Sequence, residues 1–478
     1  MPDLNALFLK VGNYCRREVI ICSPSDRLTD AAATMQSHNI SSLVVCSGVN
    51  TLGILTDRDL RNKVVAQGID PGTLSVADVM NSPVITISED DYLFEALHLI
   101  SRHRIHRLVV TGPGGELAGI ITDSDILRVQ TLSPQQLVRE IEEAPAVESL
   151  KDLHQRVQEL VQHLVGTGVH IRDMVRLIAH LNDRIVIRLI EVLREGRFEG
   201  LTEQFAFVVL GSEGRSEQTL TTDQDNALVY ADDLTARDVQ LLEEFSILLI
   251  DSLIEIGVPS CPGGIMAKNQ QWRRSLGQWR SVLDQWFSTP TPENIMNVGM
   301  FSDLRMLSGD PSLELKLKEY VAGRLQGNEI YLGHMTANML RFAVPLGWFG
   351  KIKTEKDEHA GQVDLKKAGI FAITEGVKIL ALGHGVHETG TAQRIEQLAK
   401  KEVLTQKDAD DLTASFYVLV HFRLRTQVEA IKGGRQPDNR ITLAGLNRME
   451  QERLKSALEG VRSFQKSMGN RYRLGQTM

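Results

Sequence analysis

Two aspartates separated by one residue, Asp223 and Asp225, are the side chains of this chain with the clearest capacity for chemistry. In extended backbone, positions i and i+2 point to the same face, so both carboxylates would face one site. Like charges about 4 Å apart repel by roughly 4 kcal/mol at an effective dielectric of about 20, which favours a divalent cation or a raised pKa. Asp-x-Asp also occurs at 57, 123 and 408, so the spacing alone identifies no site.

The sequence on either side distinguishes this pair from the others. An apolar run at residues 205–210 predicts a buried strand, and Gly211 and Ser212 follow it at the start of a polar helical segment. A second buried strand is predicted at residues 227–230. The first turn of a helix offers free N–H groups and a positive dipole end to a phosphate. Metal-binding acids opposite such a turn are what transfer from a nucleoside triphosphate requires; a solvated surface turn is the alternative.

The sequence GSEGRSEQTLTTDQD at residues 211–225 resembles the signature of the polymerase β-type nucleotidyltransferase superfamily. It is more similar still to the branch with the uridylyltransferase of the PII nitrogen-signalling protein, and within it to the CBS-domain-containing nucleotidyltransferases of the DUF294 group. The resemblance implies Mg²⁺-dependent transfer of a nucleoside monophosphate from a nucleoside triphosphate to an acceptor hydroxyl. Two metal ions are expected, with Mn²⁺ as an alternative, and the acceptor would be a protein or a small molecule.

The resemblance also implies roles for single residues of the motif. Asp223 and Asp225 would be catalytic metal ligands. The backbone at Gly211 and Ser212 would bind the phosphates. Arg215 is the candidate clamp for the triphosphate, because a guanidinium group binds phosphate oxygens in a bidentate manner.

Two further site residues are expected outside the motif. The polymerase β-type site uses a third acid on a neighbouring strand, and residues 297–307 read as that strand, with Asp303 and Arg305 on one face. Asp303 is therefore the candidate third catalytic carboxylate and metal ligand; the alternative is an aspartate paired internally with an arginine. The sequence DLKKAGI at residues 364–370 is similar to a lysine-containing stretch of the PII-modifying and glutamine-synthetase-modifying enzymes. Lys366 is therefore expected to contact the nucleotide.

Residues 1–130 contain an internal repeat. The sequence HNISSLVV at residues 38–45 returns as HRIHRLVV at 103–110, and GILTDRDL at 53–60 returns as GIITDSDI at 119–126. Each unit is predicted to run helix, strand, turn, strand, helix. A Thr-x-x-Asp element in each unit, starting at Thr56 and at Thr122, is typical of a capped helix start.

The repeats resemble a pair of CBS domains, and such pairs generally bind adenosine nucleotides between them. The resemblance implies that two aspartates bind ribose hydroxyls, that two threonines lie near phosphate and that a His-Arg pair adds positive charge. The residues concerned are Asp59, Asp125, Thr56, Thr122, His106 and Arg107. Helix capping alone would explain the threonines and aspartates without any ligand. Because CBS pairs commonly associate face to face, a homodimer is expected, with an adenine nucleotide as the effector of the catalytic part.

The predicted fold is α+β and multidomain. It comprises a tandem CBS pair, a helical connector, a polymerase β-like nucleotidyltransferase core with a mixed sheet and helices, and a C-terminal helical domain. The expected boundaries are 1–130 (repeats at about 15–66 and 76–130), 131–200, 201–322 and 323–478.

Composition limits the class of protein. Hydrophobic residues make up 42% of the chain and charged residues 24%, as in soluble globular proteins. The net charge of −8 argues against nucleic acid as a partner, and the absence of a long uncharged apolar run argues against a membrane. Four cysteines without metal-ligand spacing and an N-terminus without a signal-peptide pattern indicate the cytoplasm. The alternative function is a catalytically inactive adenylate sensor that binds a partner protein.

Overall fold

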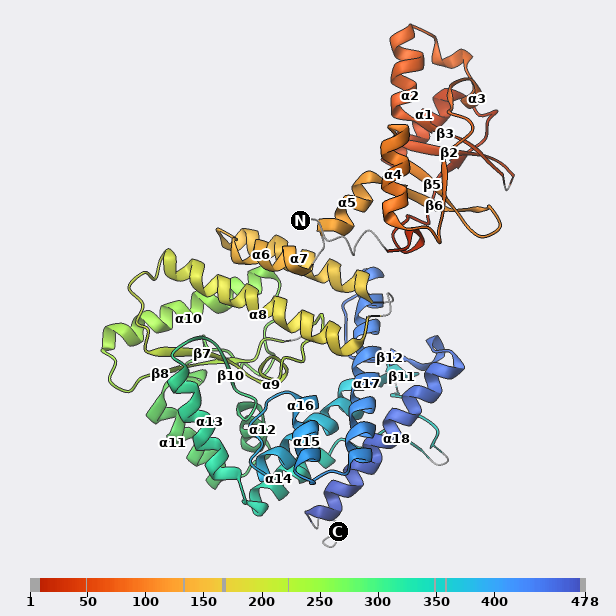
Figure 1. Cartoon of the computed structure of the whole chain (residues 1–478). Helices are drawn as coiled ribbons and strands as arrows, with labels where there is room; N and C mark the ends of the chain where they lie inside the picture. The colour runs from red at the N-terminus through yellow and green to blue at the C-terminus, as the bar shows by residue number, and fades with distance from the viewer. Residues whose placement is uncertain are drawn as a thin grey trace. The chain divides into compact units, whose positions relative to one another are not determined.

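The structure, a computed structural model of the chain, describes residues 9–48, 50–131, 134–165, 169–221, 223–347, 350–356 and 359–472, with backbone alone at 128–131. The chain forms two compact units, Met1–Gln136 and Leu137–Met478 (Figure 1). Both contain helices and strands, which confirms the prediction of an α+β multidomain protein.

The N-terminal unit contains one arrangement twice. Each repeat has a three-stranded sheet in which the first two strands are parallel and the last two antiparallel. The strands are β1 (Ile21–Cys22), β2 (Ser42–Ser47) and β3 (Asn50–Thr56), then β4 (Thr86–Ser88), β5 (Arg107–Thr111) and β6 (Leu117–Thr122); the main helices are α1 (Leu28–Ser37), α4 (Leu93–His103) and α5 (Asp123–Thr131). Thr56 Oγ1 accepts from Asp59 N at 3.2 Å and Thr122 Oγ1 from Asp125 N at 3.1 Å. The repeat and its capped helix starts are confirmed.

A mixed four-stranded sheet organises the C-terminal unit, in the order β10-β7-β8-β9. Its strands are β7 (Phe205–Val209), β8 (Asn226–Tyr230), β9 (Arg273–Ser275) and β10 (Arg305–Gly309). Strand β7 is antiparallel to both β10 and β8, whereas β9 is parallel to β8. All residues of β7 and β8 are buried, as their continuous apolar sequences predict.

Helices cover both faces of this sheet (Figure 1). Helices α7 (Val147–Leu164), α8 (Ile171–Glu195) and α10 (Ala236–Ile256) pack on one side, and α11 (Leu276–Ser288) and α13 (Pro311–Leu325) on the other. Phe205 packs on Phe245 of α10, with ring centroids 5.8 Å apart. Its neighbours in β7, Ala206 and Val208, belong to the core on the opposite face. Side chains of strand β7 therefore pack against the helices on both faces of the sheet.

The strand expected at residues 297–307 is wrong. Helix α12 (Pro292–Phe301) occupies the first five residues of this range, and β10 begins only at Arg305. Thr291 caps α12 by accepting a hydrogen bond from Asn294 N, and proline stands at its first turn. This N-terminal signal outweighs the apolar run that suggested a strand.

The rest of the C-terminal unit is mainly helical. Helix α15 is buried along nearly its whole length, and the core that it joins continues into the sheet. The elements are α14 (Glu329–Leu340), β11 (Gln362–Asp364), the short helix η9 (Lys366–Ile370), α15 (Phe371–Gly383), α16 (Thr391–Lys400), α17 (Gln406–Lys432), β12 (Arg440–Thr442) and α18 (Arg448–Arg471). The sheet and the helical domain therefore share one hydrophobic core.

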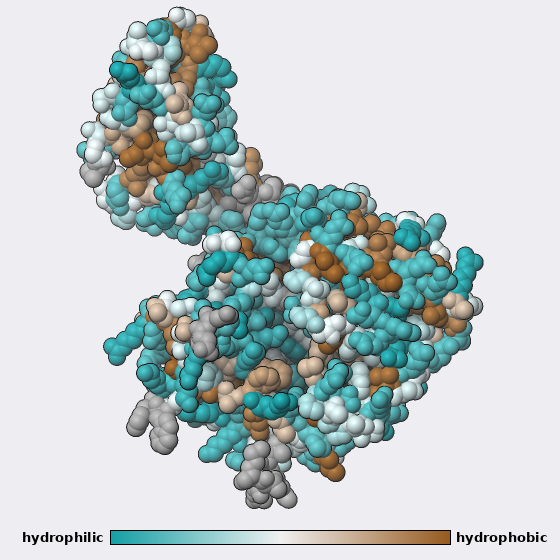
Figure 2. Space-filling view, turned by 180° about the vertical axis from the view of Figure 1, so that it is seen from behind, coloured by the Kyte–Doolittle hydropathy of each residue, from teal (hydrophilic) through white to brown (hydrophobic). Residues whose placement is uncertain are grey.

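Within the ranges that the structure describes, no helix combines the length and hydrophobicity needed to cross a membrane. The molecular face in Figure 2 is mainly hydrophilic, and its apolar residues form small separate groups.

Candidate active site

The end of strand β7 and the start of strand β8 bring the Gly-Ser turn against the second aspartate. Leu210 N donates to Asp225 O at 2.8 Å, which fixes the two segments side by side. Gly211 has a φ of +54°, and a Cβ atom there would lie 3.1 Å from Asp225 Oδ2. Glycine is needed at this position both for the left-handed backbone and for the space beside the carboxylate. The short helix α9 (Gly211–Gly214) follows, with Ser212 in its first turn.

Asp223 and Asp225 are partly buried, whereas Gln224 between them is 1% exposed and points into the interior. The pKa of Asp225 is raised to about 6, mainly by burial and also by the charge of Asp223. A hydrogen bond from the Cys261 thiol and the positive charge of Lys366 act in the opposite direction. The two carboxylates therefore influence one another, as alternation along extended backbone predicts.

This pair of carboxylates fits a hard divalent cation. Two carboxylates whose charges repel are stabilised when a metal binds between them. Mg²⁺ commonly takes one or two protein carboxylates and completes its shell with water and substrate phosphates. Among the described residues, no cluster of three acidic, histidine or cysteine side chains is placed to hold a metal. The pair thus fits Mg²⁺ or Mn²⁺ shared with phosphate oxygens, and does not form a closed protein cage.

Lys366, the first residue of η9, lies close enough to this pair for their charges to interact. Although its side chain reaches solvent, burial of its ammonium group lowers its pKa, as does repulsion from Arg423. The negative charges of Asp223 and Asp225 raise the same pKa. The structure therefore brings Lys366, expected from the resemblance, to the carboxylates of the motif. Because Lys366 belongs to the helical domain, that domain contributes to the site.

Asp303 is not at this site. It is completely buried, and its carboxylate accepts from Arg215 Nη1 at 2.6 Å, Arg394 Nη1 at 2.7 Å and Lys378 Nζ at 2.9 Å. Burial alone would raise the pKa of Asp303, but Lys378, Arg215 and Arg394 lower it to about 2. The expectation of a third catalytic, metal-binding carboxylate at Asp303 is therefore corrected: the aspartate is paired internally. Arg305, which was expected on the same strand face as Asp303, instead forms an ion pair with Asp183.

Arg215 is also committed to internal partners. Its Nε donates to Glu217 Oε2 at 2.9 Å, and its Nη1 to Asp303 Oδ2 at 2.6 Å. Glu217 also accepts from Thr391 N at 2.5 Å and from Thr391 Oγ1 at 3.0 Å, at the first turn of α16. Because Nε and Nη1 of Arg215 both have partners within the protein, the side chain is not free to bind a triphosphate. The expectation that Arg215 clamps the triphosphate is therefore corrected. Together Arg215 and Glu217 tie the motif to the helical domain.

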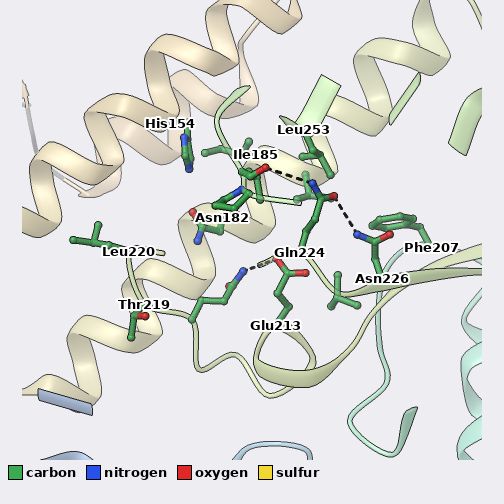
Figure 3. Close-up of a pocket in the computed structure, with 15 residues that line it drawn as sticks. His154, Asn182, Ile185, Phe207, Glu213, Thr219, Leu220, Gln224, Asn226 and Leu253 are labelled. Atoms are coloured by element: carbon green, nitrogen blue, oxygen red, sulfur yellow. Dashed lines mark hydrogen bonds between the residues drawn. The ribbon is translucent and has the colours of Figure 1, made fainter. Parts of the chain in front are cut away.

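Glu213, within the motif, faces the opposite side of the loop. It lines a cavity of about 30 Å³ together with His154, Asn182 and Gln224 (Figure 3). Burial raises the pKa of Glu213 well above its usual range, and the charge of Asp225 adds to this. Neither of the paired aspartates lines this cavity, so it lies behind the site. Sequence reasoning missed Glu213, because an acid in a first helical turn is usually solvated.

Glu213→Gln is expected to reduce the pH dependence of stability. An acid whose pKa is raised in the folded state stabilises the fold below its ordinary pKa of 4.5, and this contribution is lost as pH rises. The wild-type free energy of unfolding should fall from about pH 5 to about pH 8, and the fall should be smaller by about 1 kcal/mol or more in the variant. Urea titrations at both pH values measure this. Glu255→Gln, on the exposed surface of α10, is the matched control; an equal fall in Glu213→Gln and wild type would contradict the prediction.

In the N-terminal unit, the two aspartates of the repeats have unequal partners. Asp59 is 7% exposed, and its two oxygens accept from Asn81 Nδ2 at 2.8 and 2.9 Å. Lys63 Nζ lies 3.2 Å from the same carboxylate. Asp125 Oδ1 accepts from Arg16 Nη2 at 3.1 Å, and the Arg16 side chain is 65% exposed. Both aspartate side chains are therefore largely buried, at 9% and 13% exposure, but Asp59 has two side-chain partners outside its helix start and Asp125 has the exposed Arg16.

The His-Arg pair reaches across the junction of the two repeats. His106 Nδ1 lies 2.7 Å from Asp123 Oδ2, and Arg58 Nη2 lies 2.9 Å from His106 Nε2. Arg107 Nη1 donates to Ser41 Oγ at 3.1 Å. Since Arg58 and Ser41 belong to the first repeat, these contacts join the two repeats, and two arginines lie at their junction.

Three protein-family models match successive parts of the chain. The CBS domain matches residues 11–66 and 76–131. The "Putative nucleotidyltransferase DUF294" model matches residues 155–293, and the "Putative nucleotidyltransferase substrate binding domain" matches residues 329–472.

Curated relatives match the N-terminal part. An uncharacterised protein of Methanopyrus kandleri is 40% identical over 123 residues, 26% of this chain and 63% of that protein. Hypoxic response protein 1 of Mycobacterium tuberculosis is 33% identical over 104 residues, 22% of this chain and 72% of that protein. The chain spans 63%, 23% and 39% of the lengths of three of the relatives it matches. A CBS domain protein of Pyrobaculum aerophilum, solved with AMP, is 22% identical and covers 24% of this chain and 89% of its own, with a TM-score of 0.23.

Proposed function

Since the chain belongs to the family that joins a CBS pair to a DUF294 nucleotidyltransferase domain, we propose that it transfers a nucleoside monophosphate from a nucleoside triphosphate to an acceptor hydroxyl. Pyrophosphate is the other product. The observation that carries the proposal is the position of Asp225 beside the Gly211 turn, where its charge interacts with those of Asp223 and Lys366. The acceptor hydroxyl belongs to a protein, as in the PII-modifying enzymes that the motif resembles, or to a small molecule.

The residues of the chain supply position and charge for this reaction. Asp223 and Asp225 would hold Mg²⁺, which would supply positive charge to offset the negative charge of the phosphates. Asp223 and Asp225 hold that charge in place, and Lys366 offsets the negative charge of the phosphates. Because Gly211 has no side chain, the substrate can approach the backbone beside Asp225. Phosphoryl and nucleotidyl transfer depend mainly on such positioning and electrostatic stabilisation.

Labelled nucleoside triphosphates test the proposal directly. The full chain is incubated with each of ATP, UTP, GTP and CTP, in the presence of Mg²⁺ and a cell extract. A label on the α-phosphate should become attached to an acceptor, whereas a label on the γ-phosphate should leave in pyrophosphate, and EDTA should stop both. Separating protein from small molecules then identifies the class of acceptor. If no nucleotide gives retained α-label, the proposal is wrong.

A second candidate is an inactive sensor that regulates a partner protein. The observation that favours it is the pairing of Asp303 with three cations, which removes the third acid expected at the site. An inactive sensor would bind Mg²⁺ and a nucleoside triphosphate at most, without releasing pyrophosphate. Pyrophosphate release in the labelling experiment therefore separates the two candidates.

We expect an adenine nucleotide to bind the CBS pair beside Asp125 and not beside Asp59. Asn81 and Lys63 occupy the carboxylate of Asp59, while Arg16, the partner of Asp125, is exposed and can turn towards a phosphate. Isothermal titration with AMP, ADP and ATP should give one site per N-terminal unit. Asp125→Asn should weaken binding at least about tenfold, the effect of losing a charge-assisted hydrogen bond. Asp59→Asn is the matched control; the reverse pattern would contradict this prediction.

A further inference from the structure

Arg423 on helix α17 is a buried cation without an acidic partner. It is 6% exposed. Its Nε donates to Asn439 Oδ1 at 2.6 Å, and its Nη2 lies 3.5 Å from Thr221 O. Both partners are neutral. Nη1 makes no hydrogen bond to any described residue, and no carboxylate in the described ranges lies within ion-pair distance of the guanidinium group.

The other buried cations of the described chain are all paired. Arg273, which is also 6% exposed, lies 2.8 Å from Glu243. Arg394 and Lys378 both pair with Asp303. A buried charge is strongly unfavourable unless an opposite charge compensates it. Arg423 is therefore placed to receive an anion that is not part of the chain.

The surroundings of Arg423 indicate where that anion binds. Its contact with Thr221 O lies on the loop that leads to Asp223. Burial lowers the pKa of Arg423 to about 10, and the charges of Asp364 and Asp223 oppose this effect without direct contact. Arg423 and Lys366 also act on one another electrostatically. Arg423 therefore contacts the segment that leads to the carboxylate pair, and the charges of both cations interact with that pair.

One residue holds both cations in position. The side chain of Asn439 accepts from Arg423, and its backbone oxygen accepts from Leu365 N at 2.9 Å, directly before Lys366. The antiparallel pairing of β11 with β12 supports the same two segments. The separation between Arg423 and Lys366 is therefore set by the fold of the helical domain.

We infer that Arg423 and Lys366 together bind the triphosphate group of the substrate, so that the helical domain supplies the phosphate-binding half of the active site. The inference rests on the proposed function. It assigns to Arg423 the triphosphate-binding role that was expected of Arg215. A guanidinium group presents a planar fork to phosphate oxygens, and a lysine adds a point charge. Asp223 and Asp225 would hold the divalent cation, which would add positive charge for the same phosphates.

Binding of inorganic tripolyphosphate with Mg²⁺ tests the inference on the full chain. Tripolyphosphate lacks the adenine base, so the CBS pair does not obscure the measurement. Arg423→Gln should weaken binding about 10- to 100-fold, the range for losing a charge-assisted hydrogen-bond pair. Arg423→Lys keeps the charge and loses the fork, so binding should weaken at least about threefold. Arg425→Gln is the matched control, because Arg425 lies on the same helix and pairs with Glu450.

Each outcome decides the inference. Wild-type affinity in Arg423→Gln, or no binding of tripolyphosphate to the wild-type protein, overturns it. If Arg423→Gln does not fold, as judged by its melting curve, Arg423→Lys decides, and wild-type affinity in that variant overturns the inference. Nucleotidyl transfer by the wild-type protein is measured separately. Weakened binding in the variants without any transfer would leave the anion site standing and remove only the proposed function.

Discussion

Asp225→Asn is expected to lower the rate of nucleotidyl transfer by at least about 10²-fold, and Asp223→Asn by a similar factor, the usual cost of losing a main electrostatic element of an active site. Asparagine keeps the shape of each side chain but removes the charge that a divalent cation requires. In Asp225→Asn the Gly211 turn should keep its conformation, since it depends on the backbone bond between Leu210 and Asp225. The effect should therefore appear in the rate and in Mg²⁺ affinity, whereas stability at neutral pH should not fall, because the pKa of Asp225 is raised in the folded protein.

Retention of α-phosphate label by the acceptor measures this rate. Asp251→Asn is the matched control: Asp251 lies on α10 with a 55% exposed side chain and pairs with Lys268 on the surface. It should transfer at the wild-type rate. Near-normal transfer in Asp225→Asn, with an unchanged melting curve, would place the active site elsewhere in the molecule.

Asp303→Asn is expected to destabilise the C-terminal unit by about 3–5 kcal/mol, the cost of removing one partner from a buried ion pair. Its loss would leave Arg215, Arg394 and Lys378 with only Glu217 and Glu375 as acidic partners. Urea unfolding at neutral pH measures the loss. Glu191→Gln removes a partner of Arg188 that is 51% exposed, and it should cost less than about 1 kcal/mol.

The same variant has a defined effect at low pH. The pKa of Asp303 is lowered to about 2 in the folded state, so its stabilisation is present above the ordinary carboxyl pKa and is lost as pH falls through 2. This contribution, about 2 kcal/mol, should be missing from the acid unfolding curve of Asp303→Asn. A folded Asp303→Asn protein should also keep its Mg²⁺ affinity. A large loss of Mg²⁺ affinity with unchanged stability would instead make Asp303 a metal ligand.

The sequence correctly predicted those features that depend on interactions between residues close together in the chain. The continuous apolar runs that became β7 and β8 read correctly because both of their faces are buried. The Thr-x-x-Asp helix starts read correctly because a cap is made within four residues. The side-by-side placement of Asp223 and Asp225 follows from alternation along an extended segment.

Other features depend on contacts between distant segments. The partners of Asp303 include Lys378 and Arg394, which lie on helices α15 and α16, and no local pattern connects them. Helix α12 was missed because its apolar residues suit a strand as well as a helix, and its cap was overlooked. For Arg423, only its burial and the lack of an acidic partner among the residues that the structure describes suggest a role.

The contacts of Arg215 and Glu217 determine what the presence of these two residues in a related chain indicates. Both side chains lie within the signature sequence, yet they fasten the loop to Asp303 and Thr391. A descendant that had lost all chemistry would still need them to keep its C-terminal helices docked. Their presence in a relative is therefore a marker of architecture, and only the two aspartates report on whether that relative is an enzyme.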